Sequence, residues 1–89
     1  MTEETITLEV SRFIKKNFLF DEDADLNDQR SLMGTGVVDS TGALELISFL
    51  ETRFQLEFND SELVVENFDS VERIKSLIKR KLTEIEPKL

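Results

Sequence analysis

Cysteine and histidine are both absent from the 89 residues of this chain. Without cysteine there is no disulfide framework, no thiol nucleophile and no thiolate metal site. Without histidine the chain lacks the one side chain whose unperturbed pKa lies near neutrality. Catalysis by a Cys-His or Ser-His pair and zinc binding by histidine are therefore excluded, and we expect no catalytic residue and no metal ion.

Long apolar runs and an excess of positive charge are also missing. No stretch approaches the roughly 20 apolar residues that span a bilayer, and no signal-peptide pattern opens the chain. The formal net charge of −8 disfavours nucleic acid and anionic membranes and favours partners with basic patches. We expect a soluble, cytoplasmic protein without membrane insertion, whose length suits one domain with a modest core.

Apolar residues recur at helical spacing along most of the chain, and no segment alternates as a strand would. This periodicity predicts an all-α fold, an antiparallel four-helix bundle with one short helix and a long loop between the first two helices. The predicted helices cover residues 2–19, 40–54, 62–66 and 71–84. Their core stripes are Ile6, Val10, Phe13 and Ile14 in the first helix, Ala43, Leu46, Ile47, Leu50 and Phe54 in the second, and Val71, Ile74, Ile78, Leu82 and Ile85 in the last.

The connection from residue 20 to residue 38 has no sustained periodicity. Its acidic run 21–25 does not match a calcium-binding loop, because Leu26 and Leu32 stand where that loop needs glycine and glutamate. Long loops in compact domains tend to be functional or anchored. The expected anchors are Leu26, Leu32, Met33 and Val37, and the expected inward-facing residues after the second helix are Phe58, Leu63 and Phe68.

The stretch from Gly36 to Gly42 joins this loop to the second helix and contains the pair Asp39-Ser40. Ser40 is expected in the first helical turn, where unpaired backbone N–H groups and the helix dipole would stabilise an attached phosphate. A simple N-cap would also account for such a pair. Gly42 costs roughly 1 kcal/mol of helix propensity relative to alanine, which suggests that another group approaches the backbone closely there.

The segment Gly36-Val37-Val38-Asp39-Ser40 resembles the Gly-x-x-Asp-Ser signature of acyl and peptidyl carrier proteins. The first helix, the long loop, the second helix and the ending ENFDSVERIKSLI are similar to that family too, so the resemblance covers nearly the whole chain. It implies a single carrier domain over residues 1–89. It also implies that Ser40 carries 4′-phosphopantetheine, taken from coenzyme A, through a phosphodiester.

The function that the resemblance implies is that of a free-standing carrier, not an enzyme, which presents an acyl or aminoacyl thioester to partner enzymes. The implied partners are a phosphopantetheinyl transferase, an AMP-forming ligase that activates the acyl or aminoacyl group, and an acyl transferase or synthase with a basic docking patch. No nucleic acid is implied as a partner, and the carrier is expected to be a monomer.

The residues after the serine depart from the pattern of fatty-acid carriers, which usually have leucine and then a polar residue there. Thr41-Gly42 is closer to free-standing carriers of amino acids or specialised acyl groups, so specialised metabolism is favoured over bulk fatty-acid synthesis. An aminoacyl or peptidyl carrier of an amino-acid-activating system is the alternative. A small or polar cargo is expected, because four aromatic residues are predicted to fill the bundle interior: Phe13, Phe54, Phe58 and Phe68.

The polar side of the second helix is expected to face the partners. The predicted docking residues are Asp39, Thr41, Leu44, Glu45, Ser48 and Thr52, and the acids expected to meet basic patches are Glu45, Glu51, Glu62 and Glu66. A function of a different class is an unmodified acidic helical interaction module, in which the charge is only a solvated face. Such a module has no need of a helix-start serine behind a glycine-bordered loop.

Overall fold

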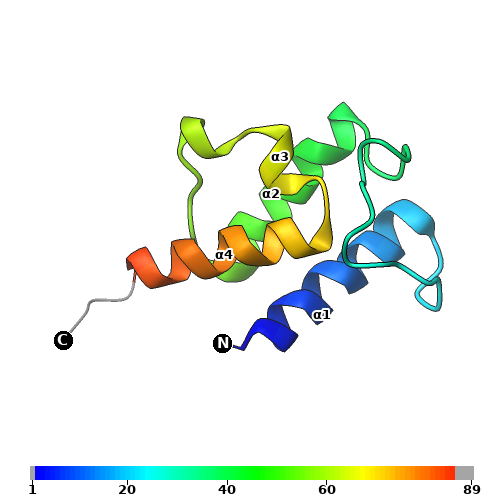
Figure 1. Cartoon of the computed structure of the whole chain (residues 1–89), viewed down its shortest axis with the longest axis horizontal. Helices are drawn as coiled ribbons and strands as arrows, with labels where there is room; N and C mark the ends of the chain where they lie inside the picture. Colours follow the sequence, from blue (N-terminus) through cyan, green and yellow to red (C-terminus); the bar gives the residue numbers. More distant parts are fainter. Residues whose placement is uncertain (1, 86–89) are drawn as a thin grey trace.

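Helices account for the regular secondary structure of residues 2–85, the part of the chain that this computed structural model describes (Figure 1). The predicted all-α fold is confirmed. α1 and α4 contact each other and run in opposite directions along the long axis of the molecule. In chain order the elements are α1 (Glu3–Ile14), its π-helical continuation η1 (Lys15–Leu19), α2 (Ser40–Phe54), the 3-10 turn η2 (Asp60–Glu62), α3 (Val65–Phe68) and α4 (Val71–Ile85).

One hydrophobic core joins these helices, and the centre of each predicted stripe lies in it. Ile14, Leu46 and Ile74 are fully buried. Val38 and Leu77, which were not among the predicted core residues, are also fully buried. Half-buried residues border the core, and those from the predicted stripes are Phe13, Ala43, Ile47 and Leu82. The side chain of Ile85, the last residue of the predicted stripe in α4, lies outside the described part of the chain.

The first helix begins at Thr2, whose side-chain oxygen accepts a hydrogen bond from the backbone N–H of Thr5 at 3.1 Å. Beyond Ile14 the helix widens into η1, which ends where Phe20 adopts the left-handed conformation at φ 55°. A π turn advances less per residue than an α turn. Two residues of η1, Phe18 and Leu19, pack against the core.

The long connection between η1 and α2 is held mainly by polar contacts with the turn before α4. The carboxylate of Asp69 accepts hydrogen bonds from the hydroxyl of Ser31 at 2.8 Å and from the backbone N–H of Met33 at 2.9 Å. The backbone carbonyl of Asp69 accepts the N–H of Leu32 at 2.6 Å. The expected apolar anchors contribute as well, since Leu26 and Leu32 are buried, and Met33 and Val37 are half-buried. The loop that leads to Ser40 is therefore held against the turn before α4.

The short third helix was predicted in the wrong place. Residues 62–66 contain the end of η2, a non-helical step at Leu63 and Val64, and only the start of α3. Leu63 was expected to face inward but is 43% exposed. The inward positions are taken by Phe58 and Phe68, whose rings meet edge to face with centroids 5.3 Å apart. The two flanking aromatic rings fill this part of the core, so the chain between them lies on the surface.

Candidate functional site

Ser40 is the first residue of α2, and its side chain is exposed. The N-cap is Asp39, whose Oδ1 accepts the backbone N–H of Gly42 at 2.7 Å. Its carbonyl oxygen accepts the N–H of Ala43 at 2.8 Å. The N-cap interpretation of the Asp-Ser pair is therefore confirmed: Asp39 caps the helix, and the neighbouring Ser40 is exposed. The amino terminus of a helix favours a negatively charged group on that hydroxyl.

The residues immediately before Asp39 fix the direction in which the chain enters α2. Val38 is buried, and its N–H donates to the carbonyl of Leu32 at 3.0 Å. Gly36 has φ 78°, a left-handed conformation that glycine adopts without strain. Because Leu32 is in turn bonded to Asp69, a continuous chain of contacts runs from the turn before α4 to the start of α2.

Gly42 is buried beneath the ring of Phe18. An alanine Cβ at this position would lie 2.6 Å from Cε1 of Phe18, much closer than such atoms approach in proteins. The sequence suggested that some group approaches the backbone here, and the structure identifies it as the Phe18 ring. Gly42 is therefore buried against Phe18 and is not part of the surface beside Ser40.

The residues predicted to dock partners all lie exposed at the start of α2 or along it. Leu44 is 69% exposed, which is unusual for a leucine and places an apolar side chain one turn beyond Ser40. The exposed polar residues with it are Asp39, Thr41, Glu45, Ser48 and Thr52. The arrangement gives one accessible helix face that includes the serine, on which the carboxylates of Asp39 and Glu45 could attract a basic surface.

Two of the acids expected to meet partners also make contacts within the fold. Glu51 accepts the backbone N–H of Phe58 at 3.0 Å. Glu62 forms an ion pair of 3.0 Å with Lys81, which is only 6% exposed. A hydrogen bond from the backbone of Asn59 lowers the pKa of Glu62, and Lys81 lowers it further. A buried ammonium needs such a partner, so the role of Glu62 is structural, while Glu45 and Glu66 remain exposed.

The aromatic residues divide between the interior and the seam of α1 with α2. Phe54, Phe58 and Phe68 are buried as expected. Phe13 is only half-buried, and its ring stacks on that of Phe49 with centroids 3.9 Å apart and an angle of 11° between the planes. The prediction that Phe13 fills the interior is therefore wrong, because the stacked pair lies at the edge of the helix contact.

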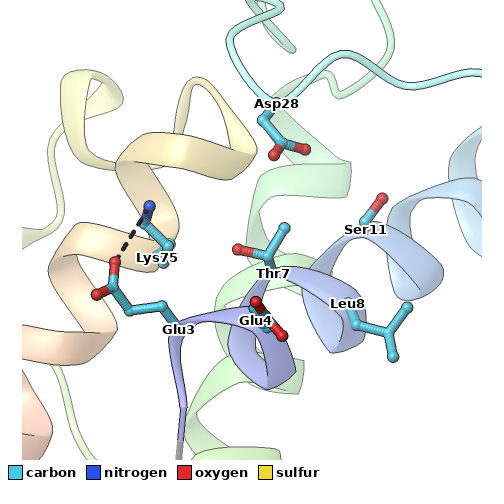
Figure 2. A pocket seen from close by; sticks show the side chains of 7 residues that line it. All are labelled: Glu3, Glu4, Thr7, Leu8, Ser11, Asp28 and Lys75. Atoms are coloured by element: carbon cyan, nitrogen blue, oxygen red, sulfur yellow. Dashed lines mark ion pairs between the residues drawn. The ribbon is translucent and has the colours of Figure 1, made fainter.

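A hollow of about 620 Å³ lies beside α1 and is open to solvent. Figure 2 shows the side chains that line it. Lys75 lies at its edge and pairs with Glu3 at 3.4 Å and with Glu72 at 2.9 Å. The lining residues are Glu3, Glu4, Thr7, Leu8, Ser11, Asp28 and Lys75. Ser40 is not among these residues, so the hollow is separate from the site at α2. The charge of Lys75, which lines the hollow, is paired with those of Glu3 and Glu72.

Two further features bear on possible functions. Among residues 2–85, no helix combines the length and the apolar character needed to cross a membrane. Within the same residues, acidic side chains do not gather in threes that could hold a metal ion.

Comparison with known proteins adds no identification: the chain matches no protein-family model, and a search of curated proteins finds no match.

Proposed function

We propose that this chain is a carrier protein that holds an acyl or aminoacyl thioester on a 4′-phosphopantetheine arm attached to Ser40. The observation that carries the proposal is the exposed hydroxyl of Ser40 at the first position of α2, directly after the capping Asp39. The likeness of Gly36-Val37-Val38-Asp39-Ser40 to the carrier-protein signature supports the same assignment.

The attachment step needs an external enzyme. The oxygen of Ser40 would attack the phosphorus that bears the pantetheine of coenzyme A, forming a phosphodiester and releasing adenosine 3′,5′-bisphosphate. The proton of the hydroxyl must pass to a base. The chain has no histidine, and the Oδ1 atom of Asp39 is engaged by the N–H of Gly42. A phosphopantetheinyl transferase therefore supplies the base and the magnesium.

The carrier itself would act by tethering. A group on a flexible arm is present at high effective concentration at whichever active site the carrier docks to. The ligase that activates the cargo with ATP and the transferase or synthase that consumes it would share the face that contains Leu44, Glu45 and Ser48. Charge on that face would govern encounter and orientation more than final affinity.

The proposed function is tested by incubating the full chain with coenzyme A, magnesium and a broad-specificity phosphopantetheinyl transferase. The intact mass is expected to increase by one phosphopantetheinyl group. A chain that stays folded and gains no mass would refute the carrier and favour the unmodified interaction module.

Replacing Glu45 with lysine is expected to slow the transfer of the acyl or aminoacyl group to the arm by the cognate enzyme at low salt. The difference from wild type is expected to be smaller at high salt. The reason is that Glu45 is exposed on the proposed docking face, and screening shortens the range of its field. Initial rates at two ionic strengths measure the effect. The matched control is Glu22→Lys, which makes the same charge change in the loop after η1. Equal rates for the two variants would remove Glu45 from the docking surface.

The cargo that we propose is small or polar, such as an amino acid or a short acyl group, on an exposed arm. Phe54, Phe58 and Phe68 fill the interior, and a packed core resists an inserted chain. Thermal unfolding of carriers loaded with acyl groups of increasing length is expected to give an unchanged midpoint. A buried chain would instead stabilise the fold by about 0.8 kcal/mol for each added methylene, so a steady rise would show sequestration.

A further inference from the structure

The ring of Phe18 is braced where it meets the start of α2. Phe18 belongs to η1 and is half-buried against the core. On its other side the ring meets that of Phe13 edge to face, with centroids 6.0 Å apart. Phe13 is in turn stacked on Phe49, two turns further along α2 than Gly42. The ring therefore has little freedom to move away from α2.

The space between this ring and α2 has no room for a side chain at position 42. A Cβ atom there would lie 2.6 Å from Cε1 of Phe18 and 3.2 Å from Oδ1 of Asp39. That same oxygen accepts the N–H of Gly42 and caps the helix. A methyl group would thus press on the ring and on the cap together, and Ser40 lies between Asp39 and Gly42 in the same turn.

We propose that Phe18 and Gly42 are positioning residues for Ser40: the ring closes over the bare backbone of Gly42 and sets how the first turn of α2 presents the serine hydroxyl. The inference rests on the proposed function of Ser40. Neither residue needs to touch the arm or the cargo, because both act through the geometry of the turn. Glycine is then required at position 42 because the Phe18 ring leaves no space for a side chain there. Its presence after Thr41 carries no information about the cargo.

The test compares the kinetics of loading for the wild-type chain, Gly42→Ala, Phe18→Leu and the double variant. Gly42→Ala is expected to lower kcat/KM of the transferase about tenfold, since small displacements of a reacting group reduce rates steeply. Leucine at position 18 stays apolar but has no atom at the place of the ring Cε1. The double variant is therefore expected to regain most of the lost rate, which a merely destabilising effect of alanine would not allow.

A variant that is destabilised far from Ser40 distinguishes an effect on the position of Ser40 from an effect on the stability of the fold. Ile78→Val removes one methyl group from a fully buried residue of α4, so it is expected to lower the thermal midpoint and leave loading unchanged. Phe18→Leu alone adds no bulk, and it is expected to speed amide hydrogen exchange at residues 41–44 through loss of the brace. Unchanged exchange at these residues would overturn the inference even if Gly42→Ala fails to fold.

The outcomes also distinguish the inference from the function on which it rests. A wild-type chain that takes no arm refutes the proposed function and this inference with it. A wild-type chain that loads, together with a folded Gly42→Ala chain that loads at the same rate, leaves the function intact and overturns the positioning role. Failure of Phe18→Leu to restore the rate of Gly42→Ala overturns it as well.

Discussion

Replacing Asp69 with alanine is expected to lower the free energy of unfolding by about 3 kcal/mol, because a charged acceptor is lost and its partly buried donors are left unpaired. The Asp69 carboxylate accepts the hydroxyl of Ser31 at 2.8 and 3.0 Å and the backbone N–H of Met33 at 2.9 Å. These bonds join the long loop to the turn before α4. Urea unfolding followed by circular dichroism measures the effect.

Two further variants serve as comparisons for Asp69→Ala. Asp69→Asn keeps one acceptor oxygen, so it is expected to fall between wild type and alanine. Asp25→Ala removes an exposed acid from the same loop, and it is expected to change stability by no more than about 0.5 kcal/mol. If Asp69→Ala is no less stable than Asp25→Ala, the loop is not held by this carboxylate. The backbone hydrogen bonds from Asp69 to Leu32 and from Leu32 to Val38, which alanine at position 69 retains, would then hold the loop without the carboxylate.

Replacing Ser40 with alanine is expected to abolish loading completely while leaving the fold unchanged. The hydroxyl is the proposed point of attachment, so no residual rate is expected from a chain without it. The side chain is exposed, and alanine suits a helix, which keeps the stability within about 0.5 kcal/mol of wild type. Intact mass after incubation with the transferase measures loading, and thermal unfolding measures stability.

The matched control is Thr41→Ala, which removes the hydroxyl of the next residue in the same exposed turn. This variant is expected to take the arm. Loading of Ser40→Ala would show that another residue is the acceptor, whereas loss of loading in both variants would point to damage to the turn as a whole.

The long helices were predictable because their stripes repeat at the period of a helix and their ends carry local signals. α2 begins and ends at the predicted residues, Ser40 and Phe54. α4 begins at Val71, as predicted, after Ser70, whose hydroxyl accepts the N–H of Arg73 at 3.1 Å. Periodicity and capping act within one or two turns, so a single sequence displays them.

The contacts that fix the loop were not predictable, because they join residues far apart in the chain. Ser31 and Asp69 are 38 positions apart, and neither belongs to a periodic pattern. Lys81 illustrates the same limit: a lysine is expected at the surface, but Lys81 lies buried in α4, where it pairs with Glu62 and Glu84. Leu63 was misplaced for the opposite reason, since its hydrophobicity suggested burial where Phe58 and Phe68 had already filled the space.

The site was predicted in part. The position of Ser40 at the start of α2 and the cap by Asp39 follow from residue types that favour those places. The cost of glycine in a helix indicated that some group approaches Gly42. Identifying that group as Phe18 required the structure, because the π winding of η1 determines where the ring lies and leaves no clear pattern in the sequence.

The most direct test of the carrier proposal is to locate the added group on the loaded wild-type chain by fragmentation mass spectrometry. Trypsin cleaves after Arg30 and Arg53, so the peptide of residues 31–53 contains Ser40 together with Ser31 and Ser48. We predict one phosphopantetheinyl group on this peptide, with fragment ions that place it on Ser40. An unmodified peptide, or fragment ions that place the group on any other residue, would contradict the proposal.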